Sequence, residues 1–303
     1  MAQASAARRR IIYGVESVFG TTPADGKIMR NTGDSLNLSK NTIQSSELSG
    51  DRAIRFLRHG NETVSGDISF ELAYGDFDDF IEAALGGTWN ADVVKQGTLI
   101  RTFSIEKGFQ DIVQYIVYNG CAINTLTIDM ATDAVVTGTV GIVGAGTDGY
   151  TGASFDASPT AVTLTDPFVT YDGTVTLAGG DGCIITALSL SIDNGITANY
   201  ALCSAEARSV TPDRVNVTGT ATILFENATE VNKFITETTS SLSVTLEDPT
   251  GNALTIELPK IKYTGGDIPV SGGGVVSVSL PFQALYDDTA GVLSAIVVTR
   301  NPI

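Results

Sequence analysis

The feature that most limits the possible folds is an alternation of apolar and polar residues that occurs twice in the same setting. Residues 64–70 (VSGDISF) and 217–223 (VTGTATI) both alternate, and a stretch with helical spacing follows each of them. A period of two is typical of a strand with one buried face. The chain is therefore predicted to be mainly β, with a short helix beside each of these strands.

Both predicted helices are short and amphipathic. In the first, Asp76 is the expected N-cap and Gly86-Gly87 the expected end. The apolar positions at helical spacing are Phe77, Phe80, Ile81, Ala84 and Leu85 in the first helix and Val231, Phe234 and Ile235 in the second. We expect Phe77, Phe80, Ile81 and Leu85 to pack on the sheet of the first module.

The similarity between the two parts extends beyond the strand and the helix. Each part has a strand upstream, a pair of strands downstream and a final apolar strand, in the same order. This repeated order predicts a duplicated module; the alternative is that unrelated strands resemble one another. The matching stretches are 36–39 with 188–191, 51–52 with 213–214, 99–117 with 242–261, and 135–143 with 275–282.

These matches divide the chain into three parts. Residues 1–143 are predicted to form the first module and 183–303 the second. Residues 144–182, rich in Gly, Thr, Ser and Asp, are predicted to be an insertion or linker with short strands of its own. Residues 33–60 are unusually polar for a segment between two strands, which predicts a long functional loop.

The charge excludes proteins that grip nucleic acid. The chain carries 34 acidic and 18 basic residues, a net charge of −16, whereas a nucleic-acid-binding surface must neutralise phosphates with Lys and Arg. This sign suits a surface past which DNA slides without adhering. No apolar run is long enough to span a membrane, and the N-terminal residues lack the apolar stretch of a secretory signal.

No pattern in the sequence predicts catalysis, a cofactor or a metal. Residues 144–149 fit G-x-G-x-x-G, but no helical pattern follows, so a dinucleotide site is not expected. His59 is the only histidine, and Cys121, Cys183 and Cys203 are too widely spaced for a zinc site or a disulfide framework. Trp89 is expected to be a packing anchor. The carboxylates of Asp76, Asp78, Asp79 and Glu82 are expected to form a solvated helix face.

Several stretches, in their order along nearly the whole chain, resemble the tail tube proteins of siphophages, in particular the larger type with a two-part chain. They are Ile12–Ser17 with Phe19–Pro23, Ser45–Glu47 with Asp51-Arg52, Gly66–Leu72 with Asp78–Phe80, Leu188–Asn194, Leu258–Tyr263 and Pro281–Asp287. The resemblance implies a non-enzymatic structural protein of the virion tail, made in the host cytoplasm.

The resemblance also implies a particular assembly. Each module would be a β-sandwich with a flanking helix and a long hairpin, and neighbouring subunits would join strands into a ring β-barrel. Stacked rings would form the tube through which DNA passes during ejection, with a tape measure protein and a tail terminator as further partners. Two modules in each chain favour a pseudo-hexameric ring of three chains over a ring of six.

Residues can be assigned to this assembly from the strand pattern. Asp67, Ser69, Glu71, Thr218 and Thr220 are predicted to face the lumen, and Ser45, Ser46, Glu47, Asp51 and Arg52 to form an inter-ring loop. Two other classes of protein stay open. One is another phage structural or surface β protein, such as a decoration or baseplate subunit. The other is a β-rich glycan hydrolase, which the single Trp and the aromatic content of 7% disfavour.

Overall fold

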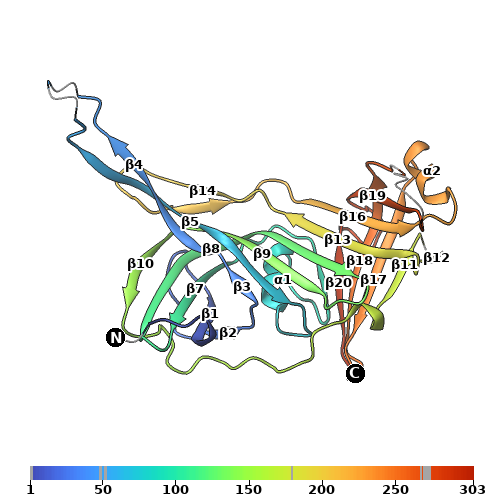
Figure 1. Cartoon of the computed structure of the whole chain (residues 1–303), viewed down its shortest axis with the longest axis horizontal. Helices are drawn as coiled ribbons and strands as arrows, with labels where there is room; N and C mark the ends of the chain where they lie inside the picture. Colours follow the sequence, from blue (N-terminus) through green and yellow to red (C-terminus); the bar gives the residue numbers. More distant parts are fainter. Residues whose placement is uncertain (1–2, 48–49, 51–52, 179, 267, 269–273) are drawn as a thin grey trace.

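The fold is mainly β, with little helix (Figure 1). A computed structural model describes residues 3–47, 50, 53–178, 180–266, 268 and 274–303. Within these residues every strand except β14 (Thr197–Asn199) and β15 (Ser209–Thr211) belongs to one continuous, largely antiparallel hydrogen-bonded network. The mainly β class expected from the alternation is therefore confirmed.

Six strands form the central part of this network, which we call the central sheet. Their spatial order is β5, β9, β8, β13, β16 and β19, and each pair of neighbours is antiparallel. The short β3 and the longer β4 pair with β5 at one edge. The bounds are β3 (Gly33–Asp34), β4 (Asn37–Gln44), β5 (Leu57–Glu71), β8 (Gln114–Ala131), β9 (Thr137–Gly144), β13 (Ile185–Asp193), β16 (Asn216–Leu224) and β19 (Ser277–Ala284).

The remaining strands form two outer groups. The first surrounds the early part of β8, and the second surrounds β18, which also reaches the end of β19. β20 pairs with both β18 and β6, so the end of the chain returns to the first half. The first group is β1 (Arg9–Val15), β2 (Lys27–Met29), β7 (Thr102–Phe109) and β10 (Gly146–Thr151). The second is β11 (Thr174–Leu177), β12 (Gly180–Asp181), β17 (Ser240–Glu247), β18 (Ala253–Tyr263) and β20 (Val297–Asn301), with β6 (Val93–Lys95) between the groups.

One face of the central sheet is apolar and forms part of the core. Phe70 on β5 stacks on Phe77 with ring centroids 3.9 Å apart. Gly138 lies opposite Phe70, and a side chain at that position would collide with the Phe70 ring. In the second half the large and small partners are exchanged between strands: Gly219 on β16 lies opposite and under Phe282 on β19. In each pair a phenylalanine on one strand packs over a glycine on the other, but the two residue types have changed places between the halves.

Helix α1 (Asp78–Leu85) lies within the core. Phe80 contacts Tyr13 of β1 and Phe103 of β7, with ring centroids 4.6 and 5.2 Å apart. Phe77, Phe80, Ile81 and Leu85 are all buried, as the helical spacing predicts. Gly86 ends the helix in a left-handed conformation, also as predicted. Asp76 is not the N-cap, because the helix begins after Phe77 and Asp76 instead accepts a hydrogen bond from Arg30.

Helix α2 (Thr229–Ile235) forms where the second apolar spacing predicts it, but it lies at the periphery (Figure 1). Val231 is buried, whereas 38% of Phe234 and 68% of Ile235 are exposed. The spacing therefore predicts the helix correctly, but only one of its three apolar positions is buried. The two remaining helical turns are the 3-10 segments η1 (Ala6–Arg8) and η2 (Thr170–Asp172).

Strands β4 and β5 continue beyond the body as a long hairpin (Figure 1). Much of the segment expected to be a loop is therefore strand, and only residues 45–56 connect the two strands. In the second half, the chain between β13 and β16 leaves the sheet and forms the β14–β15 arm instead. Tyr200 of this arm donates a hydrogen bond to the Glu62 carbonyl at 2.7 Å, so the arm braces the base of the hairpin.

The segment 144–182 runs along the body from the first half to the second. It pairs with β8 through β10 and with β17 through β11. Between these strands it makes single bridges to Lys27, Ala73 and Val135. The chain thus connects its two halves with a strap that is attached at several points.

The pairing registers change one detail of the internal comparison. When Val64 is aligned with Val217, Leu38 corresponds to Ile192, because these residues lie opposite the two valines. The sequence comparison aligns Leu38 with Leu190, two residues earlier. A shift of two residues leaves every side chain on the same face of a strand, so alternation alone cannot detect it.

Candidate functional site

The second face of the central sheet is polar and open. Residues that lie directly opposite one another in antiparallel strands project from the same face, so the registers define rows that cross the sheet. Three such rows alternate with the apolar rows of the core. They are Glu71–Thr137–Asp129–Ser189–Thr220–Pro281, Ser69–Thr139–Thr127–Ser191–Thr218–Gln283 and Asp67–Gly141–Thr125–Asp193–Asn216.

Hydroxyl and amide groups hold this polar face together. Ser69 and Thr139 lie 3.3 Å apart between their hydroxyl oxygens, within hydrogen-bond distance. Gln283 donates from Nε2 to Asn216 Oδ1 at 3.0 Å. Neutral side chains thus satisfy one another along the rows and cover the backbone of the sheet.

The charge on this face has one sign. The three rows contain four carboxylates, those of Asp67, Glu71, Asp129 and Asp193, and no Lys or Arg. All four residues are exposed. The face therefore repels polyanions, and its hydroxyl and amide groups offer only neutral contacts.

The sequence-predicted lumen residues all lie on this face. Asp67, Ser69 and Glu71 come from β5, and Thr218 and Thr220 come from β16. The strands between them, β8 and β13, contribute Asp129 and Asp193, which were not among the predicted residues. Their signal was the same alternation, in TLTID at 125–129 and LSLSID at 188–193.

The predicted inter-ring residues lie elsewhere, in the hairpin connection. Ser45, Ser46 and Glu47 are exposed beyond β4. Asp51 and Arg52 lie outside the described residues. Nearby, the large apolar residues Ile43, Phe56 and Leu57 expose between 55% and 61% of their surface.

The helix carboxylates are not a solvated face, contrary to expectation. Each pairs with a base: Asp76 with Arg30, Asp78 with Arg300, Asp79 with Lys27 and Glu82 with Arg101. Burial raises the pKa values of Asp76 and Asp78, and the arginine partners oppose that shift. These pairs attach α1 to surrounding segments, so their role is structural.

Two further residues singled out in the sequence also have structural surroundings. Trp89 is half-buried against the core, and the Arg300 guanidinium lies 4.2 Å from its ring centroid, as suits a packing anchor. His59 is exposed on the hairpin opposite Thr42. β10 starts at Gly146, so a strand and not a helix occupies the G-x-G-x-x-G stretch.

In the part of the chain that the structure describes, no cluster of three potential ligand side chains is arranged to hold a metal ion. Nor is any helix there long and apolar enough to cross a membrane.

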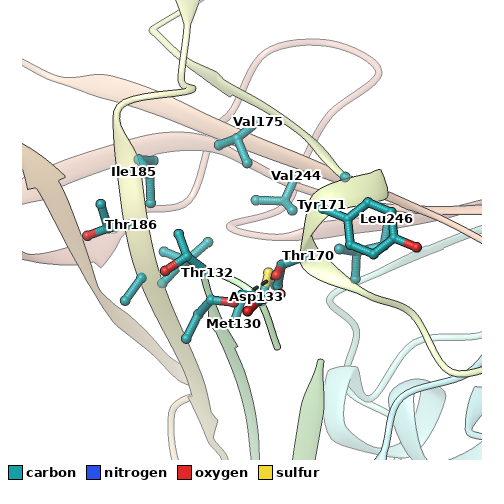
Figure 2. Close-up of a pocket in the computed structure, with 14 residues that line it drawn as sticks. Met130, Thr132, Asp133, Thr170, Tyr171, Val175, Ile185, Thr186, Val244 and Leu246 are labelled. Carbon is teal, nitrogen blue, oxygen red and sulfur yellow. Dashed lines mark hydrogen bonds between the residues drawn. The ribbon is translucent and has the colours of Figure 1, made fainter. Parts of the chain in front are cut away.

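An apolar pocket of about 280 Å³ opens where the two halves meet (Figure 2). Its walls come from the end of β8, the start of β13, η2 and β17, and include Met130, Ile185, Val244 and Leu246. Asp133 and Tyr171 lie at its exposed rim. Glu71, Asp129 and Ser189 share one row, and the pocket lies next to that row, at the Glu71 end of the sheet. The hairpin leaves the sheet at the opposite end, near Val64.

Comparison with known proteins identifies the chain. The family model described as phage tail tube protein matches residues 6–284, which is nearly the whole chain. Comparison with curated proteins gives no match. The chain therefore belongs to the phage tail tube protein family, a structural family of the virion tail.

Proposed function

We propose that the protein polymerises as stacked rings into the tail tube, and that the polar face of the central sheet lines the lumen through which DNA passes. The two halves act as equivalent modules, residues 1–143 and 183–303, joined by the 144–182 strap. DNA slides past without specific binding, and the ends of the tube meet the tape measure protein and the tail terminator.

The observation that carries this proposal is the junction between β8 and β13. Ala131 to Thr125 pair with Ala187 to Asp193 in one uninterrupted antiparallel register. The polar rows therefore cross from one half to the other without a break. A strand edge of one module is thus already paired with the first strand of the next, and repetition of this junction between chains would close a barrel.

The number of chains in the ring follows from this equivalence. If each chain supplies two modules, three chains supply six, and a pseudo-hexameric ring with threefold symmetry results. The four carboxylates of the polar face would then repeat around the lumen. Repulsion between these carboxylates and phosphates keeps DNA from adsorbing, within a range of about 8–10 Å at physiological salt.

Stacking of the rings would use the two ends of the sheet. We infer that the tip of the hairpin, with Ile43 and Phe56, seats in the apolar pocket of a chain in the next ring. The charges of the two partners are complementary. Residues 37–61 contain four Lys or Arg and two Asp or Glu, whereas residues 108–207, which supply much of the pocket, contain no Lys or Arg.

Electron microscopy of the purified chain tests the function. We expect hollow tubes whose rings have threefold symmetry and whose two halves superpose after rotation by about sixty degrees, as a ring of six modules requires. Rings of six chains would reject the module equivalence but leave the tube function intact. Protein that stays monomeric at all concentrations would reject the tube function itself.

A variant separates ring formation from stacking. Phe56→Ser removes an exposed apolar side chain and should leave the fold intact while giving single rings or short stacks. Leu202→Ser, at an exposed position of the β14–β15 arm, is the matched control and should form tubes of normal length. Normal tubes from Phe56→Ser would show that the hairpin tip does not hold rings together.

A further inference from the structure

Helix α2 leaves large apolar side chains uncovered at one end of the central sheet. Phe234 and Ile235 are 38% and 68% exposed. Phe234 and Leu280 of β19 both lie close to Gly266, which follows β18. Among the described residues, the outer side of β19 is paired only near Phe282–Ala284 with β18 and at Pro281 with Thr264. An apolar helix face and an incompletely paired strand thus lie together.

The equivalent end of α1 shows what covers such a surface. Ala84 is the seventh residue of α1 and is fully buried, and Ile235 is the seventh residue of α2. The cover over α1 comes from the second half of the chain. Asn194, directly after β13, donates from Nδ2 to the carbonyl oxygens of Ala84 and Ile123, both at 3.0 Å.

The pairing registers identify the counterpart of this cover in the first half. Leu38 corresponds to Ile192, so Lys40 corresponds to Asn194. Lys40 is exposed on β4 and pairs with Glu62. On its other side, β4 has no strand partner among the described residues.

We propose that the β3–β4 edge of a second copy covers α2, with Lys40 of that copy at the end of the helix beside Ile235. This inference rests on the proposed ring and names the surfaces that close it. The intramolecular contact of α1 with β13 and Asn194 is its template. A lysine ammonium suits this position, because the last carbonyl groups of a helix attract cations. The side chain of Glu237, 85% exposed just beyond α2, carries a carboxylate that already lies 3.9 Å from the Lys262 ammonium.

Crosslinking in the assembled full-length protein tests the contact. In a Cys183→Ser, Cys203→Ser background, the double variant Lys40→Cys, Ile235→Cys is assembled and treated with a short bis-maleimide. Chains should link covalently to one another, up to the number of chains in one ring. Each single variant, and the pair Leu202→Cys, Ile235→Cys, should stay mainly uncrosslinked.

The outcomes separate this inference from the proposed function. Rings that form normally but give no more crosslinking than the Leu202 control would overturn the contact and leave the tube function standing. Failure of the unsubstituted chain to form rings would overturn both. Crosslinked multimers that appear only in assembled samples would support both.

A charge introduced into the contact gives a second readout. Ile235→Lys places an ammonium group at a solvent-exposed position, so the monomer should keep its melting temperature. Its ring formation should weaken roughly tenfold or more, because burial of an isoleucine side chain is lost at every junction and the new charge repels Lys40. Leu202→Lys is the control and should assemble like the unsubstituted chain. Assembly of Ile235→Lys at the unsubstituted concentration would contradict the proposal.

Discussion

Helices α1 and α2 follow strands with the same alternation, β5 and β16, yet one is buried and the other is largely exposed. Both are attached by a tyrosine hydroxyl that donates to a carboxylate: Tyr13 to Asp79 at 3.0 Å, and Tyr263 to Glu230 at 2.8 Å. The attachment is therefore similar, and the difference lies in what covers each helix. Asn194, from the second half of the chain, contacts the end of α1, whereas the end of α2 leaves Ile235 68% exposed.

Burial of these helices therefore depends on what the rest of the chain packs against them as well as on local sequence. The apolar spacing of α2 resembles that of α1, but the spacing specifies only a helix with an apolar side. Whether that side is covered depends on segments that are distant in the sequence. Under the proposed ring assembly, the exposed Ile235 is a surface for a second copy to cover.

The strongest test of the comparison replaces a core aromatic in each helix. Phe80→Ala should lower the free energy of unfolding by about 3–5 kcal/mol, because the side chain is fully buried between β1 and β7. Phe234→Ala should cost less than half as much in the monomer, since the side chain is partly exposed. Denaturant unfolding of both variants under non-assembling conditions measures the difference. Equal losses would show that the two helices are equally buried in solution.

A smaller effect on the free energy of unfolding is expected from the two corresponding residues Asn194 and Lys40. Asn194→Ala should cost about 1–3 kcal/mol, because the carbonyl groups of Ala84 and Ile123 lose their donor in a buried setting. Lys40→Ala removes an exposed ion pair with Glu62 and should change monomer stability by less than about 1 kcal/mol. Thermal unfolding compares them, and a Lys40 loss as large as the Asn194 loss would contradict their different surroundings.

The two tyrosine anchors predict a shared sensitivity to alkaline pH. Burial, followed by the nearby carboxylate, raises the pKa values of Tyr13 and Tyr263, and burial raises the pKa of Tyr118 to about 12. An unfolded tyrosine ionises near pH 10. Above that pH the unfolded chain releases protons that the folded chain retains, so the stability present at lower pH is lost as the pH rises.

Tyrosine-to-phenylalanine variants show how much each half of the chain contributes to the loss of stability at alkaline pH. Tyr13→Phe and Tyr263→Phe should each lose about 1 kcal/mol at neutral pH with the hydrogen bond, and each should flatten the fall in stability above about pH 10. The double variant should keep the part that Tyr118 contributes. Unfolding free energies at a series of pH values measure the slopes, and an unchanged slope in both variants would show that these hydroxyls do not control it.

The sequence was sufficient for the features that depend on local pattern. Alternation predicted the β class and the polar face of β5 and β16. Helical spacing of apolar residues predicted both helices, and Gly86 predicted the end of α1. Features that depend on partners distant in the chain were missed. Arg300 and Lys27 neutralise helix carboxylates that looked solvated, and the exposure of Ile235 depends on which segments pack beside α2. The sequence alignment of the strand of Leu38 with the strand of Ile192 was shifted by two residues. Such a shift keeps every side chain on the same face of its strand, so only the backbone pairing reveals it.

The smallest effect on stability, and the most direct test of the proposed lumen, comes from the polar face. Asp67 and Asp193 lie in the same row, one in each half, and are exposed. Replacing Asp67 with Asn or Lys should change the free energy of unfolding by no more than about 0.5 kcal/mol, the usual range for surface substitutions. Asp193 also accepts a hydrogen bond from the Gly195 amide at 2.9 Å, which Asn can keep and Lys loses.

The effect on DNA should be larger, and equal for the two halves. Each lysine introduced into a negatively charged lumen both removes a repulsive charge and adds a partner for phosphate. Assembled tubes with Asp67→Lys or Asp193→Lys should therefore retain short single-stranded DNA at low salt and release it as salt rises, whereas the Asn variants should retain far less. Co-sedimentation of labelled DNA with the tubes gives the measurement. If only one of the two lysine variants retains DNA, the halves do not present equivalent faces to the lumen; if normal tubes of both variants retain none, the polar face does not line it.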